Sequence, residues 1–135
     1  LSTSTIFAAF SAALILSAIL GPATGRAIDR RGGRDILALS NLILAAGLLT
    51  LAAAPNAAIL TVGWLLLGVG MAAGLYDAAF ATLAGLYGRA ARAPITGITL
   101  IAGFASTVGW PLSAILADAF GWRIACAAWA ALHLC

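Results

Sequence analysis

Long runs without charge alternate along the chain with short segments that hold most of its polar residues. Five runs read as membrane spans, at residues 5–23, 36–54, 58–87, 93–117 and 124–135, and the last of them is truncated. A helix of about twenty apolar residues crosses the roughly 30 Å of hydrocarbon in a bilayer. The pattern therefore predicts an all-α polytopic membrane protein, in the form of an incomplete transmembrane domain.

The connections between these runs differ in charge. Residues 24–35 and 88–92 form basic loops, and the alternation of sides puts six arginines together: Arg26, Arg30, Arg31, Arg34, Arg89 and Arg92. The opposite side receives only Arg123. Because arginine is enriched in cytoplasmic loops, the two basic loops are predicted to be cytoplasmic in a multi-pass protein of the cell (inner) membrane.

Composition supports this assignment and limits the partners. The chain is 64% hydrophobic and 8% charged, with a mean hydropathy of +1.11, whereas soluble domains carry about 25% charged residues. The net charge of +3 indicates membrane topology rather than nucleic-acid binding, because the arginines lie in connections. The lipid bilayer is thus one expected partner. The start without Met and the truncated last run add the missing remainder of the chain as another.

Several kinds of chemistry find no support. Cys126 and Cys135 would lie about 13 Å apart along one helix, too far for a disulfide, and are expected to pack as small apolar residues. His133 has no companion ligand and reads as an ordinary helix residue. We expect no metal and no cofactor. No nucleophile elbow, Walker loop, zinc-protease helix or carboxylate pair is present, so an enzyme or ATP-driven pump is not expected.

Glycine is frequent in the run at residues 58–87, which we expect to be one long helix. In a membrane bundle, glycines provide a flat face for a neighbouring helix or leave room for a substrate. The residues concerned are Gly63, Gly68, Gly70, Gly74 and Gly85. Gly21 and Gly25 form a second, shorter pair of small residues at helical spacing.

Asp77 is the candidate for solute or proton binding. It lies ten residues before Tyr87, about 15 Å inside the membrane, where a carboxylate costs roughly 2.5–3.5 kcal/mol. Two readings stay open, a proton or cation site and a protonated acid bonded to a hydroxyl of an adjacent helix. Tyr76 and Phe80 flank it, and lesser candidates follow in the next span: Thr99, Ser106, Thr107 and Trp110. Asp118 and Arg123 are expected to be solvated turn residues.

The first basic loop resembles a known motif. Gly25-x-x-x-Asp29-Arg30-x-Gly32-Gly33-Arg34 is similar to the signature loop between the second and third helices of the major facilitator superfamily, G-x-x-x-D-R/K-x-G-R/K-R/K. It departs from that motif at Gly33, where the family has a basic residue. Arg92 with Gly97, and Gly121-Trp122-Arg123, resemble two further connections of the family. The likeness implies helices two to six of the amino-terminal half, with helices eight to twelve as the alternative.

The resemblance implies a function. By that likeness the chain would belong to a secondary active transporter of a small-molecule solute, working by alternating access and driven by a proton or solute gradient. The gating loop would comprise Gly25, Asp29, Arg30, Gly32 and Arg34, too far from mid-membrane to touch a central site. The alternative is a non-transporting membrane assembly or signalling protein on the same scaffold.

Overall fold

The computed structural model describes residues 2–135, and within that range it contains helices and no strand. The elements are α1 (Thr3–Arg31), α2 (Gly33–Ala53), α3 (Ala57–Gly74), α4 (Tyr76–Tyr87), the 3₁₀ turn η1 (Gly88–Ala90), α5 (Arg92–Phe120) and α6 (Trp122–Leu134). Four helical segments are long and apolar enough to cross a membrane: Thr3–Arg31, Gly33–Ala53, Ala57–Ala90 and Arg92–Phe120. The fold is an all-α helical bundle of a membrane protein.

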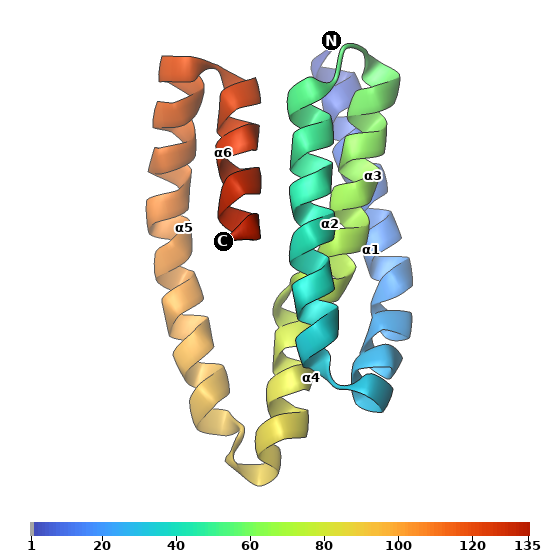
Figure 1. Cartoon of the computed structure of the whole chain (residues 1–135), viewed down its shortest axis with the longest axis vertical. Coiled ribbons are helices and arrows are strands. Elements are labelled where there is room, and N and C mark those ends of the chain that lie inside the picture. Colours follow the sequence, from blue (N-terminus) through green and yellow to red (C-terminus); the bar gives the residue numbers. More distant parts are fainter. Residues whose placement is uncertain (1) are drawn as a thin grey trace.

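The helices run up and down beside one another, so the connections fall at two ends (Figure 1). The α1–α2 corner and the α4–α5 connection lie at the lower end of that view, and the α2–α3 and α5–α6 connections at the upper end. The lower connections contain Arg30, Arg31, Arg34, Arg89 and Arg92. The arginine-rich segments are therefore together in space, as the alternation of spans requires.

The first basic segment is a sharp corner between helices rather than an open loop. Residues 24–35, predicted as a loop, are helical except at Gly32. The Gly32 N–H bonds to the Ile28 carbonyl at 2.8 Å and ends α1, and its φ of +83° turns the chain into α2. Glycine adopts positive φ without the steric cost that a side chain brings. The prediction follows the charges, which mark where the membrane ends and not where the helix ends.

The third span also differs from its prediction as one helix over residues 58–87. It breaks at Leu75, whose backbone is extended (φ −82°, ψ −176°) between α3 and α4. Gly74, the last residue of α3, weakens the helix by about 1 kcal/mol relative to alanine. Leu75 itself is apolar, so its own hydrophobicity gives no sign of the break.

Glycines of α3 set the close packing at the centre of the bundle. A methyl group on Gly68 would lie 2.5 Å from the Ala13 carbonyl oxygen of α1, and one on Gly63 would lie 2.8 Å from Leu51 Cδ2 of α2. Gly70 and Gly74 similarly face α2. Gly85, by contrast, has no atom within 4 Å of such a methyl group. The flat helix face expected from the sequence thus exists on α3 and does not extend to α4.

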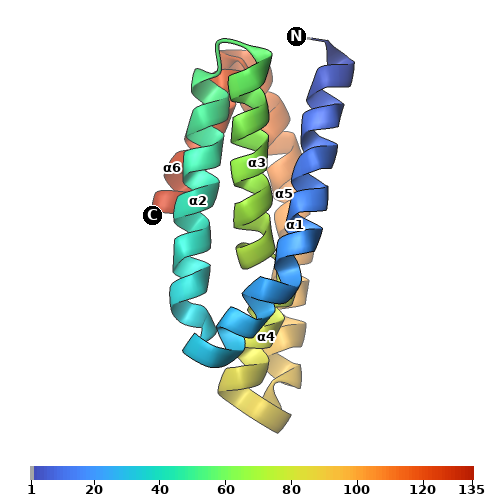
Figure 2. The ribbon, with the colours of Figure 1, turned by 90° about the vertical axis from the view of Figure 1, so that its right-hand side faces the viewer.

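Helix α6 lies against α2 and connects α5 to the rest of the bundle (Figures 1 and 2). Arg123, expected to be a solvated turn residue, donates 2.6 Å hydrogen bonds to the carbonyls of Ala52 and Ala54. These carbonyls belong to the end of α2, where the helix offers them no N–H partner. Helix α5 has no buried residue among those described. Most of its surface is therefore available for contact with lipid or with another segment.

Candidate functional site

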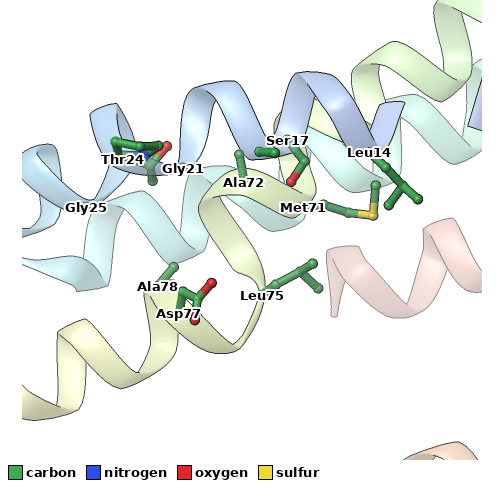
Figure 3. Close-up of a pocket in the computed structure, with 12 residues that line it drawn as sticks. Leu14, Ser17, Gly21, Thr24, Gly25, Met71, Ala72, Leu75, Asp77 and Ala78 are labelled. Carbon is green, nitrogen blue, oxygen red and sulfur yellow. The ribbon is translucent and has the colours of Figure 1, made fainter. Parts of the chain in front are cut away.

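A pocket of about 470 Å³ opens at the break between α3 and α4, where these helices face α1 (Figure 3). Its lining comes from two sides of the bundle. The α1 side supplies Leu14, Ser17, Ala18, Gly21, Pro22, Thr24 and Gly25, and the other side supplies Met71, Ala72, Leu75, Asp77 and Ala78. The pocket is mostly apolar, and Asp77 is its one ionisable residue.

Asp77 owes its position to the helix break. It is the second residue of α4, in the first turn, where backbone N–H groups have no partner within the helix. A negative charge at a helix N-terminus is stabilised by about 0.3–1 kcal/mol. An unbroken helix would place Asp77 in mid-helix without this help, so the break makes a carboxylate at this depth less costly.

Polar neighbours of Asp77 are few. Thr24 faces it across the pocket in Figure 3, but the Thr24 hydroxyl donates to the Leu20 carbonyl of its own helix at 3.1 Å. Within residues 2–135 no hydroxyl hydrogen bond to the Asp77 carboxylate is formed, and the side chain is exposed. The carboxylate is therefore free to meet an ion, a proton or a solute.

The two aromatic residues predicted to flank Asp77 do not line its pocket in the structure. Tyr76 and Phe80 stack on each other, with ring centroids 5.5 Å apart and planes inclined by 39°. Neither lines the pocket that holds Asp77. Gly25, on the other hand, does line it, although the signature loop was expected to lie too far from a central site. Helix α1 contains Pro22 and bends along its length (Figure 2), and α4 packs against it, so the first residue of the motif reaches the pocket.

The other motif residues surround the corner. Asp29, Arg30 and Arg34 are exposed on the last turns of α1 and the first turn of α2. Gly33 is buried, and a side chain there would collide with Thr82 of α4. The departure from the family motif at this position is thus a packing requirement of the corner itself.

Comparison with known proteins agrees with the motif. The sequence model of the Major Facilitator Superfamily matches residues 1–135. The chain belongs to the major facilitator superfamily. It is therefore a transporter of the major facilitator kind, a family whose members are transporters and not enzymes. No curated protein and no solved structure matches this facilitator chain.

The α5 candidates of this facilitator lie away from Asp77. Ser106 and Trp110 border a pocket of about 420 Å³ that also involves Ser113 and Trp129. Thr99 and Thr107 line a smaller hollow of about 260 Å³ on the same helix. The structure therefore divides the candidates predicted from sequence between the α1–α4 pocket and two hollows along α5.

Besides the Arg123 hydrogen bonds, two further polar contacts between helices of the facilitator were not anticipated. Trp129 Nε1 donates to Ser113 Oγ at 3.0 Å, joining α6 to α5. His133 Nδ1 and Asn41 Oδ1 lie 2.8 Å apart, joining α6 to α2. Trp129 and His133 are four residues apart, a spacing that places them on one side of a helix. That spacing is the only sequence signal, and it does not reveal the partners.

Proposed function

We propose that this facilitator chain is part of a secondary active transporter that moves a small solute by alternating access, driven by a proton or solute gradient. The observation that carries the proposal is Asp77, an acid in a mostly apolar pocket at a helix break inside a membrane span. Intramembrane acids usually face a bundle interior or a watery cavity and often have a transport role.

The pocket has a suitable size for a small solute. Small-molecule sites typically have volumes of about 300–1,000 Å³, and this one has about 470 Å³. Apolar parts of a solute would contact Leu14, Met71 and Leu75. The aromatic pair of Tyr76 and Phe80, next to the break, would flank the path of the solute. The α5 residues Thr99, Ser106, Thr107 and Trp110 would add polar or aromatic contacts once the remaining segments of the bundle surround them.

Coupling follows from the charge of Asp77. An ionised carboxylate inside the membrane is costly, and binding of a proton or cation removes that cost. The occupied pocket can then change its access, whereas the empty, charged pocket opposes the change. In this scheme Asp29, Arg30 and Arg34 act at the arginine-rich end as a gate towards the rest of the chain and lipid headgroups, with Gly25 and Gly32 shaping the corner.

The test is Asp77→Asn, which keeps the size of the side chain and removes its charge. We expect coupled, gradient-driven transport to be abolished while folding stays intact, as measured in vesicles with radiolabelled solutes and an imposed proton gradient. Asp118→Asn is the matched control, because Asp118 is an exposed acid near the opposite end of the bundle. Normal gradient-driven transport by Asp77→Asn would disprove the coupling role. No transport of any solute by the unaltered protein would favour an assembly or signalling protein on this scaffold.

A further inference from the structure

The contact between His133 and Asn41 places an imidazole beside α2, one of the helices long and apolar enough to cross a membrane. Asn41 lies eight residues after Gly33, the first residue of α2, and therefore about 12 Å along that helix. His133 approaches it from the last turn of α6, with 2.8 Å between His133 Nδ1 and Asn41 Oδ1. Figure 1 shows the end of α6 beside α2.

The orientation of the Asn41 amide is fixed by its second hydrogen bond. Asn41 Nδ2 donates to the Leu37 carbonyl of its own helix at 3.1 Å. A carbonyl oxygen only accepts hydrogen bonds, so the NH₂ group must be on that side. Asn41 Oδ1 then faces His133, and because this oxygen also only accepts, the proton of the contact must be on His133 Nδ1.

The neutral imidazole is thereby restricted to one tautomer. With the proton on Nδ1, the Nε2 atom keeps its lone pair, and within residues 2–135 it forms no hydrogen bond. We propose that His133 Nε2 is a proton-binding site, separate from Asp77 and held ready by Asn41. Imidazole is the side chain that ordinarily gains and loses a proton between about pH 5 and 8.

The charged and titratable groups described on the packed helices do not bond to His133. Helix α2 carries Arg34 and Asp35 at its start, seven and six residues before Asn41, and α5 carries Arg92 and Asp118 near its two ends. Besides Arg123 and His133, α6 carries the titratable Cys126, and Cys135 follows the helix with its thiol bonded to the Ala131 carbonyl at 3.3 Å. No ionised side chain among the described residues is bonded to His133, so a neutral amide is its partner.

Proton uptake would change the contact between α2 and α6. The bond from His133 Nδ1 to Asn41 Oδ1 remains in the imidazolium form and becomes charge-assisted, which makes such bonds roughly twice as strong. A proton at Nε2 therefore tightens the attachment of α6 to α2. This response does not depend on Asp77 or on the identity of the solute.

The test uses the fact that His133 is the one histidine of this sequence. The protein, with ¹⁵N-labelled histidine in lipid nanodiscs, is studied by NMR between pH 5 and 8, and His133→Gln assigns the signal. We expect the neutral ring to carry its proton on Nδ1, and Nε2 to take up a proton on acidification.

A second variant tests whether Asn41 selects the tautomer of His133. Asn41→Leu should remove the restriction and move the neutral ring towards the Nε2–H tautomer. Thr50→Val is the matched control on α2, because the Thr50 hydroxyl bonds only within its own helix, to Ala46. An Nε2–H tautomer in the unaltered protein, or an Nε2 atom that stays unprotonated on acidification, would overturn the proposal. Neither measurement requires transport, so failure here leaves the proposed function of Asp77 standing.

Discussion

At the scale of single residues, Gly33 shows how packing can replace a charge in a motif. The position is basic in the family motif, yet in this chain it is buried at the corner between α1 and α2. A Cβ atom there would overlap the Thr82 side chain of α4, whose hydroxyl is tied to the Ala78 carbonyl at 2.7 Å. The corner therefore packs on α4 through glycine, and the basic end of the motif begins at Arg34.

Restoring the family residue should consequently harm the protein. Gly33→Arg is expected to lower the free energy of unfolding by about 1–3 kcal/mol, the usual cost of overpacking. Thr82→Gly should recover part of this loss, although it lowers the helix stability by a few tenths of a kcal/mol by itself. Unfolding of the single and double variants in a denaturing detergent measures the coupling between the two positions. Unchanged stability of Gly33→Arg would show that α4 moves away from the corner readily.

At the scale of elements, the sequence predicted what depends on hydrophobicity and spacing. The membrane-spanning helices follow from apolar runs, and the close approach of α3 to α1 and α2 follows from its glycines. The break at Leu75 does not, because it depends on how α3 and α4 pack against α1 and α2 rather than on local polarity. For the same reason the sequence pointed to Asp77 but not to its pocket, which α1 completes from more than fifty residues away.

Arg123 is another contact that depends on the assembled helices. Its guanidinium bonds to two carbonyls at the end of α2 and lies 4.7 Å from the centroid of the Trp122 ring. The planar group matches two acceptors at once, whereas a lysine ammonium is a single point charge. This contact fixes the start of α6 to the end of α2.

Substitutions of Arg123 should therefore lower the stability of the protein by different amounts. Arg123→Gln should lower the free energy of unfolding by roughly 1.5–3 kcal/mol, since hydrogen bonds from charged groups contribute about that much. Arg123→Lys should fall between this variant and the unaltered protein, because one of the two bonds can persist. Thermal unfolding followed by Trp fluorescence measures the order of the three proteins. Equal midpoints for all three would mean that the turn is held by the backbone of Gly121 alone.

At the scale of the whole molecule, the helix topology gathers the arginine-rich connections at one end of the bundle, as the charge asymmetry of the sequence predicts. The corner at Gly32 and the turn η1 lie at one end, together with most of the arginines, and the turn at Asn56 lies at the other. Arginine-rich connections remain on the cytoplasmic side of a membrane. The Asp77 pocket lies between α1 and the α3–α4 break. The orientation of the bundle therefore determines which side of the membrane is closer to this pocket.

Cysteine labelling tests that orientation directly. In a Cys126→Ala, Cys135→Ala background, Arg89→Cys should react with a membrane-impermeant thiol reagent in inside-out vesicles and stay unlabelled in intact cells. Asn56→Cys should behave in the opposite way, because one segment of membrane-spanning length, the α3–α4 segment Ala57–Ala90, separates these positions. Labelling of both from one side would contradict the up-and-down topology, whereas a complete reversal would keep the bundle and invert it. In the inverted case the arginine-rich corner would face outwards, and a cytoplasmic gate formed by Asp29, Arg30 and Arg34 would no longer be tenable.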